Sequence, residues 1–240
     1  MKRSIFVGYD PREQTAFSVA MSSAGRHLSE FVPIHGLFLG ALIDKGLYRR
    51  PLEYRTTETG KRVMWDVISE APMATEHANA RWLTPHLARS GWALFMDGDM
   101  LVRGDLAPMF DSLDPAMAVY CVKHEFEPAG DVKMDGQIQT RYARKLWSSF
   151  VAFNCDHPAN QALTLDLINT APGRDLHRLC WLQDDLIGEL GPEYNFLVGH
   201  TPSSVIPKVI HFTDGVPDMP GYEHCDYADE WRAEQRRRAA

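Results

Sequence analysis

Two carboxylates stand one residue apart directly after an apolar segment of the chain. Trp92–Met96 is followed by Asp97, Gly98 and Asp99, and apolar residues resume at Met100. Acidic side chains at the carboxyl end of a buried strand lie where open α/β sheets bind ligands, and their oxygens suit Mg²⁺ or Mn²⁺ carrying a diphosphate. Because Gly98 has no side chain, a phosphate could approach the backbone there. A plain turn is the alternative, since Asp-Gly is a common turn dipeptide.

Polar residues also stand at the ends of the first and last predicted strands. Tyr9 and Asp10 follow the first strand, and His211 lies within the last. Strand ends of a doubly wound sheet converge on one crevice, so His211 could complete a metal centre with the two acids. A core histidine bonded to a backbone carbonyl is the alternative. Asp10 precedes Pro11, which also makes it a candidate N-cap for the next helix.

Strands and helices are predicted to alternate along the chain. Short apolar segments predict strands over residues 4–8, 31–35, 92–96, 118–122, 149–153 and 209–212. Helical spacing or capping predicts helices over residues 11–24, 75–88, 160–169 and 181–190. Residues 36–70 show no clear period and are expected to form an irregular excursion over the binding face. This alternation predicts an α/β fold with a mostly parallel twisted sheet and helices on both faces.

Length and composition fit one globular domain. The 240 residues are 45% hydrophobic and 24% charged, and no apolar run approaches the roughly 18 residues of a membrane helix. We expect a single domain over residues 1–240, with a nucleotide-binding part at about 1–110 and an acceptor part at about 111–240. The net charge of −7 argues against general nucleic-acid binding, which depends on Lys and Arg contacts to phosphates.

The two ends of the sequence and its cysteines bear on location. The amino terminus enters a predicted strand without the apolar segment of a secretory signal, and the four cysteines form no paired motif. These features predict a cytoplasmic protein with reduced thiols. Arg232 and residues 236–238 form a basic tail. This tail is interpreted as a solvated helix end, with weak attraction to an anionic membrane surface as the alternative.

Five blocks resemble, in the correct order, nucleotide-sugar glycosyltransferases of the GT-A fold, above all family 8 and its bacterial and phage relatives. The blocks are IFVGYD at 5–10, RWLTP at 81–85, FMDGDM at 95–100, WSSFVAFN at 147–154 and HFTDG at 211–215. The resemblance implies a single Rossmann-like domain that moves a sugar from a nucleoside diphosphate sugar, expected to be a UDP-sugar, to an acceptor hydroxyl. It also implies Mn²⁺ or Mg²⁺ as cofactor and retention of anomeric configuration.

The same resemblance implies roles for individual residues. The metal ligands would be Asp97, Asp99 and His211. The nucleotide or its diphosphate would contact residues at three turns, namely Gly8, Tyr9, Asp10, Asp97, Gly98, Asp99 and Gly215. Tyr9 would stack on the base, and Asp10 would accept a hydrogen bond from it. The backbone amides around Gly215 suit a phosphate, although they could simply form a turn.

A further group of residues would act on the donor sugar and diphosphate. Their members are Arg81, Asn154, Gln183, Asp184 and Asp185. Arg81 matches an arginine that contacts donor sugar or diphosphate, with an exposed surface arginine as the alternative. Asn154 matches an asparagine beside the donor sugar, or begins a turn. The run from Gln183 to Asp185 replaces the Asp-Gln-Asp that relatives carry near the anomeric carbon.

Two more residues have weaker assignments. Lys208 could replace the lysine that contacts the diphosphate in relatives, or be a solvated lysine. Trp147 is a candidate for sugar contact, whereas most tryptophans are expected in the core.

Two other functions fit an α/β sheet with an acidic metal centre. One is nucleotidyl transfer onto a sugar phosphate, although a glycine-rich phosphate loop is missing after the first strand. The other is a catalytically inactive protein that binds nucleotides or carbohydrates. For a transferase, the acceptor would be a carbohydrate, a lipid-linked molecule or a protein. Residues 36–70 and 125–140 are the loops expected to select it.

Overall fold

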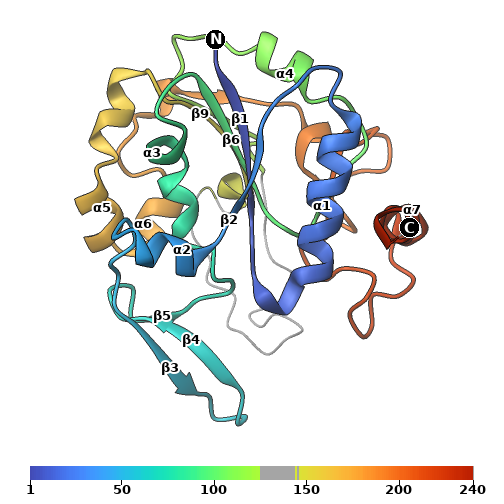
Figure 1. The fold of residues 1–240 in the computed structure, drawn as a ribbon, viewed down its shortest axis with the longest axis horizontal. Helices are drawn as coiled ribbons and strands as arrows, with labels where there is room; N and C mark the ends of the chain where they lie inside the picture. The colour runs from blue at the N-terminus through green and yellow to red at the C-terminus, as the bar shows by residue number, and fades with distance from the viewer. Residues whose placement is uncertain (125–143, 145, 240) are drawn as a thin grey trace.

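The fold is built on a six-stranded sheet (Figure 1). The computed structural model describes residues 1–124, 144 and 146–239. In sheet order the strands are β10 (Ile187–Glu189), β8 (Val119–Cys121), β9 (Phe150–Asn154), β6 (Trp92–Met96), β1 (Arg3–Gly8) and β2 (Ile34–Leu37). Neighbours are parallel except where β9 pairs with β6 and with β8. The predicted mostly parallel sheet is therefore confirmed, with β9 as its reversed strand.

Asp10 and Pro11 turn the chain from β1 into a helix. Pro11 starts the 3₁₀ turn Pro11–Glu13, and the Asp10 side chain accepts a hydrogen bond from Arg12 N at 2.8 Å. The α-helix α1 follows at Gln14–His27 and ends three residues beyond the predicted boundary. The N-cap interpretation of Asp10 is confirmed.

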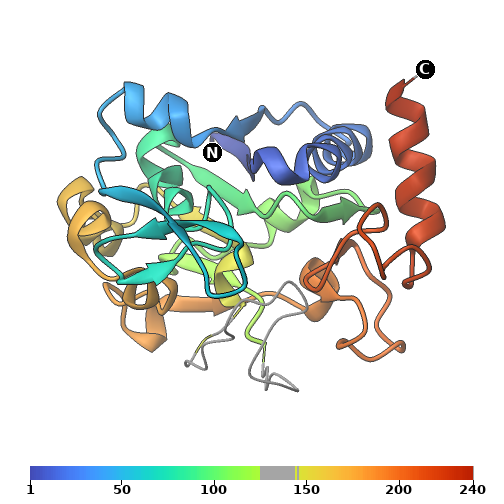
Figure 2. The same cartoon turned by 90° about the horizontal axis from the view of Figure 1, so that it is seen from below.

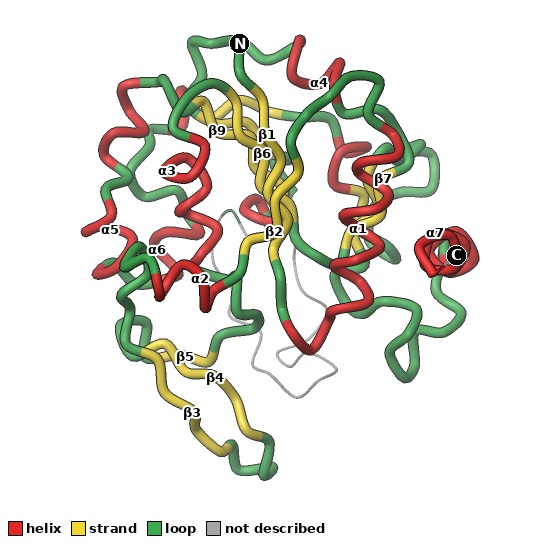
Figure 3. Tube along the Cα trace, viewed as in Figure 1, coloured by secondary structure: helices red, strands yellow, loops and turns green. Residues whose placement is uncertain are grey.

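Helices cover both faces of the sheet, as predicted (Figure 3). The core with α1 and α4 (Ala107–Asp111) includes Leu94 and Met96 of β6. The opposite core includes Phe95 from the same strand. It packs α2 (Leu39–Asp44), the turn Ala80–Leu83 with α3 (Thr84–Ala88), α5 (Leu165–Thr170) and α6 (Gly173–His177). Alternate side chains of one strand thus hold the two helical layers together.

A second, three-stranded sheet brings His211 next to the two acids of the candidate metal centre. It has the order β11-β12-β7, with β11 at Phe196–Leu197, β12 at Val209–His211 and β7 at Met100–Val102. β12 runs antiparallel to β7 and places His211 opposite Met100. His211 therefore reaches the acids through this pairing, and the expectation that its strand ends at the edge of the main sheet is wrong.

Residues 36–70 are more regular than predicted. They contain α2 and most of a three-stranded antiparallel sheet, made of β3 (Leu52–Thr56), β4 (Arg62–Asp66) and β5 (Ala71–Pro72). The β3–β4 hairpin projects from the body of the molecule (Figure 1), and Tyr54 is exposed. Because most hairpin side chains face solvent, no apolar alternation marks these strands in the sequence.

Other predicted boundaries also change. Helix 75–88 is a short 3₁₀ turn followed by α3, because Pro85 starts a helix there instead of kinking one. The prediction of a helix over residues 181–190 is wrong, since the segment forms a 3₁₀ turn at Asp184–Leu186 and then β10. Helix 160–169 splits into a 3₁₀ turn at Pro158–Ala162 and α5. The strand predicted at 31–35 begins three residues later, after Pro33.

The basic tail belongs to a helix that packs on the body (Figure 2). In α7 (Ala228–Ala239), Trp231 is fully buried, and the Glu234 carboxylate pairs with Arg26 of α1 at 2.7 Å. Trp231 packs in a cluster with Ile210 and Phe212, which flank His211. Arg232 donates a hydrogen bond to Pro217 O, whereas Arg236 and Arg237 are exposed. The tail is thus a docked helix with a solvated basic end.

Gly98 lets the Asp-Gly-Asp turn touch the end of β1, and Gly8 leaves room for the ring of His77. A Cβ on Gly98 would lie 2.4 Å from Gly8 O, and a Cβ on Gly8 would lie 2.5 Å from the ring of His77. Neither approach is compatible with a side chain. The backbone of the Asp-Gly-Asp turn therefore packs directly against the last residue of β1.

The four cysteines are free thiols. None of the described helices is long and apolar enough to cross a membrane.

We expect Trp231→Ala to lower the free energy of unfolding by about 3–5 kcal/mol, because it empties a fully buried aromatic site. Urea unfolding measures this change. Arg236→Ala, on the exposed face of the same helix, is the control and should stay within about 0.5 kcal/mol of the unmodified protein. Equal stability of both variants would show that α7 is not part of the cooperative core.

We expect Gly98→Ala to lower the free energy of unfolding by about 1–3 kcal/mol, because its methyl group meets the Gly8 carbonyl. Gly40→Ala in α2 is the matched control, since nothing lies within 4 Å of that Cβ position. The control should be neutral or stabilising by up to about 1 kcal/mol. A Gly98→Ala protein as stable as the unmodified one would contradict the close contact.

Candidate metal centre

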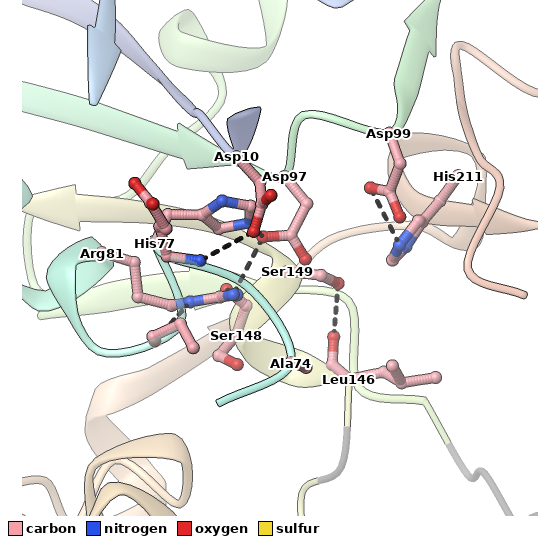
Figure 4. Close-up of polar contacts among 12 residues, drawn as sticks. Asp10, Ala74, His77, Arg81, Asp97, Asp99, Leu146, Ser148, Ser149 and His211 are labelled. Carbon is pink, nitrogen blue, oxygen red and sulfur yellow. Dashed lines mark hydrogen bonds and ion pairs between the residues drawn. The ribbon is translucent and has the colours of Figure 1, made fainter. Parts of the chain in front are cut away.

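Asp97, Asp99 and His211 converge at one point (Figure 4). Asp97 follows β6, Asp99 precedes β7, and His211 ends β12. One ligand atom from each lies within 4.8 Å of the others. The Oδ1 atoms of both acids are buried and meet no hydrogen-bond criterion, although each lies in ion-pair range of basic side chains. Two carboxylates and an imidazole gathered in this way form an oxygen-rich donor set that fits an ion such as Mn²⁺ or Mg²⁺.

Asp97 is held in its ionised form by two basic side chains. Its Oδ1 lies 3.0 Å from Arg81 Nη2 and 3.2 Å from His77 Nε2. Burial favours the neutral acid, but the Arg81 charge and the His77 contact outweigh burial and hold the pKa of Asp97 well below its usual range. A ligand that stays ionised at any physiological pH is suited to binding a cation.

Arg81 is buried and anchored on several sides. Its Nε donates to Ala78 O at 2.9 Å and its Nη1 to Ser148 O at 2.8 Å, while its guanidinium lies 4.7 Å from the Phe95 ring centroid. The exposed-arginine alternative is therefore wrong, because the residue is only 6% exposed. In the described structure the Arg81 guanidinium forms an ion pair with the Asp97 carboxylate. Contact of Arg81 with a diphosphate stays a prediction.

His211 is fixed at both ring nitrogens. Nε2 lies 3.4 Å from Asp99 Oδ1, and Nδ1 lies 2.9 Å from Asn195 Oδ1. Burial lowers the pKa of His211, but the Asp99 carboxylate outweighs burial and raises it overall. The alternative of a histidine bonded to a backbone carbonyl is wrong, since its partner is the buried side chain of Asn195.

The turn before β9 forms hydrogen bonds both with the Asp97 side of the metal centre and with the residue that holds His211. Ser149 O accepts a hydrogen bond from Asp97 N at 2.9 Å, and Ser148 O accepts the bond from Arg81. The Ser149 hydroxyl accepts a hydrogen bond from Asn195 Nδ2 at 2.8 Å and donates one to Leu146 O (Figure 4). Because β9 is reversed, its amino end and not its carboxyl end meets the acids.

Sequence reasoning missed four residues near the acids. His77 and Asn195 carry no motif, although His77 stands four residues before Arg81, the spacing of neighbours on a helix. His124 has a buried Nε2 without a partner, and burial, followed by the charge of His211, lowers its pKa to about 4. Burial, followed by the neighbouring Asp99 and then Asp10, raises the pKa of Glu13 to about 8.

Asn154 lies away from the centre, and its expected place beside the sugar needs correction. Its register partner is Trp92, at the opposite end of β6 from Asp97 and about 16 Å along the strand. Its side-chain Nδ2 donates to Pro115 O at 3.0 Å. Because β9 runs antiparallel to β6, the carboxyl end of β9 that carries Asn154 lies at the far end of β6 from Asp97.

The protein itself satisfies the Asp10 carboxylate. Three hydrogen bonds come from Arg12 and one from Glu76 N, and the residue is 1% exposed. The expected hydrogen bond to a base therefore has no free acceptor here. Tyr9 stays available in part, with its ring 5.0 Å from that of Phe17 and 4.9 Å from that of Phe38.

Three glycines are predicted to leave space for a nucleotide. In the structure, other groups of the protein fill that space. Gly8 accommodates the His77 ring, Gly98 the Gly8 carbonyl, and Gly215 the Tyr222 ring, which a Cβ would approach to 2.5 Å. Contact of these turns with a nucleotide stays a prediction.

Gln183, Asp184 and Asp185 are exposed and precede β10. Asp184 forms an ion pair with Arg144. Within the described residues, no hydrogen bond or ion pair joins these three side chains to Asp97 or Asp99. Their place near a reacting sugar stays a prediction.

Lys208 and Trp147 have partners within the protein. Lys208 Nζ donates to Tyr194 OH at 3.0 Å, at the end of β12 opposite His211. Trp147 Nε1 donates to His124 O at 3.1 Å. The loop expected at 125–140 lies outside the described residues.

Solved glycosyltransferase structures share this fold. The chain superposes on bifunctional WbbM with a TM-score of 0.62 at 15% identity, covering 98% of this chain and 49% of WbbM. For GlyE of Streptococcus pneumoniae TIGR4 the TM-score is 0.60 at 14% identity, covering 98% and 60%. For galactosyltransferase LgtC, solved with donor and acceptor sugar analogs, it is 0.59 at 16% identity, covering 98% and 95%. This chain thus spans about half of WbbM and three-fifths of GlyE, and the likeness establishes a GT-A fold.

No protein-family model matches the sequence. A curated relative does, namely Protein CDI of Arabidopsis thaliana, which is 39% identical over 233 residues that cover 95% of this chain and 83% of the relative. This chain therefore belongs to the family of Protein CDI and has the GT-A fold of nucleotide-sugar glycosyltransferases.

Proposed function

We propose that this protein is a glycosyltransferase that moves a sugar from a nucleoside diphosphate sugar to an acceptor hydroxyl and depends on Mn²⁺ or Mg²⁺. The observation that carries the proposal is the convergence of Asp97, Asp99 and His211 within 4.8 Å at the edge of a GT-A-type sheet. The GT-A fold, shared with solved glycosyltransferases, supports it. Fold alone does not determine activity, so the site carries the weight of the proposal.

The chemistry proposed for this centre is electrostatic. A divalent ion bound there would neutralise charge on the departing diphosphate, which can lower the barrier by several kcal/mol. Arg81 and His77 keep Asp97 ionised and oriented, so no rearrangement of that ligand is needed as charge develops. The Ser149 carbonyl fixes the backbone of Asp97 at the same time.

The remaining parts of the proposal concern the substrates. We expect a UDP-sugar, with its base near the aromatic group Tyr9, Phe17 and Phe38, and transfer with retention of configuration. Asp184, Asp185 and Gln183 are the candidates for the sugar side of the site. The acceptor is a carbohydrate, a lipid-linked molecule or a protein, and we expect the enzyme to act in the cytoplasm.

Asp97→Asn, Asp99→Asn and His211→Ala test the proposal. Candidate donors are first screened by thermal shift with and without Mn²⁺, because a donor stabilises the protein by mass action. Each variant should lose at least about 100-fold in donor turnover, since several kcal/mol of transition-state stabilisation is removed. Chelation of the ion should abolish turnover of the unmodified protein.

Asp218→Asn, which changes an exposed acid outside the centre, is the matched control and should keep normal turnover. The released product separates the rival functions. Nucleoside diphosphate is expected, whereas pyrophosphate would indicate nucleotidyl transfer, and binding without any release would indicate an inactive protein. Normal rates in all three variants would refute the metal centre.

A further inference from the structure

A buried chain of hydrogen bonds ends at the imidazole of His211. The Ser149 hydroxyl lies 2.7 Å from Leu146 O, Asn195 Nδ2 lies 2.8 Å from Ser149 Oγ, and His211 Nδ1 lies 2.9 Å from Asn195 Oδ1. Exposure is 3% for Ser149, 0% for Asn195 and 2% for His211. Water therefore does not offer these groups alternative partners.

The direction of this chain is fixed at its origin. A backbone carbonyl only accepts, so the Ser149 hydroxyl must donate its single proton to Leu146 O. Ser149 Oγ is then the acceptor for Asn195, which must present its amide NH₂ there. The Asn195 amide oxygen consequently faces His211 and requires a proton on Nδ1. In the neutral imidazole, this leaves the lone pair on Nε2.

We propose that Asn195 is a positioning residue that sets the tautomer and ring orientation of His211, so that Nε2 presents its lone pair beside Asp99. This inference rests on the proposed metal centre and deepens it. Nε2 lies 3.4 Å from Asp99 Oδ1, so in the neutral imidazole a lone pair and a carboxylate oxygen face one another. Two acceptors in that arrangement suit a cation between them, and a hydrogen-bonded partner on the other ring nitrogen is the usual support of a metal-binding histidine.

Ser149 also positions Asp97, another of the proposed metal ligands. Its hydroxyl directs Asn195, while its carbonyl accepts the hydrogen bond from Asp97 N. One residue just before β9 thus fixes the backbone of one ligand and, through Asn195, the ring of another. Ser149→Ala would free the Asn195 amide to reverse, so that its NH₂ could face His211.

Asn195→Leu tests the proposal with two readouts. Mn²⁺ binding, followed by electron paramagnetic resonance without donor, should weaken about 10- to 100-fold. Nitrogen-15 shifts of the His211 ring, recorded without metal at a pH where the ring is neutral, should lose the pure Nδ1–H pattern of the unmodified protein. Asn195→Asp keeps an acceptor for Nδ1–H and should retain that pattern with near-normal Mn²⁺ binding. Ser149→Ala should give a mixture of tautomers and a smaller loss of affinity.

Asn160→Leu is the matched control. Asn160 is also a buried asparagine, and it bonds the carbonyls of Ala118 and Asn154 away from the centre. The Asn160→Leu protein should be less stable than the unmodified protein but keep its Mn²⁺ affinity and its His211 tautomer. An Asn195→Leu protein that matches this control in both readouts would overturn the proposal. If Asn195→Leu does not fold, Ser149→Ala decides, and an unchanged tautomer and affinity there would overturn it equally.

His211→Ala separates the two levels of inference. If that variant binds Mn²⁺ as tightly as the unmodified protein, the proposed metal centre fails, and with it the role of Asn195 toward an ion. If it loses Mn²⁺ while Asn195→Leu keeps normal binding and tautomer, the metal centre stands and only the positioning role of Asn195 is refuted.

Discussion

The centre depends on one buried charge interaction, the one between Asp97 and its two basic neighbours. A carboxylate next to β6 loses most of its hydration, which is costly unless cationic groups compensate. Arg81 supplies that compensation and is itself anchored by two carbonyls and an aromatic face. The packing of the turn Ala80–Leu83 and of the turn before β9 therefore serves to hold one guanidinium opposite one acid. An aspartate without this support would be protonated or displaced.

The second constraint is the meeting of two sheets at the Asp-Gly-Asp turn. β6 belongs to the large sheet, whereas β7 pairs with β12 in the small one, and the turn between them carries both acids. The small sheet brings His211 to Asp99, and Phe212 N bonds Asp99 O at 3.1 Å. The residue between the two acids is constrained to be glycine, because Gly98 passes against the carbonyl of Gly8.

The sequence predicted those strands and helix starts that are determined by a few neighbouring residues. Trp92–Met96 is an uninterrupted apolar strand, and Asp10 with Pro11 marks a helix start, so both could be read directly. The direction of β9 could not be read, because orientation depends on how a distant segment returns to the sheet. The reversed direction of β9 puts Asn154 far from Asp97 and places Ser149 next to it. His77 and Asn195 were missed because a buried polar residue looks ordinary until its partners, distant in sequence, are known.

The proposed ion would reverse the net charge that the acids and Arg81 give to this centre. Asp97 and Asp99 contribute two negative charges and Arg81 one positive charge, so the empty site is negative and repels a diphosphate. A divalent ion would make the same site positive. Under the proposed function, ion and nucleotide would bind as a cooperative pair, each raising the affinity for the other by the same factor, as linkage requires. Such a protein would discriminate against free nucleotide whenever the ion is scarce.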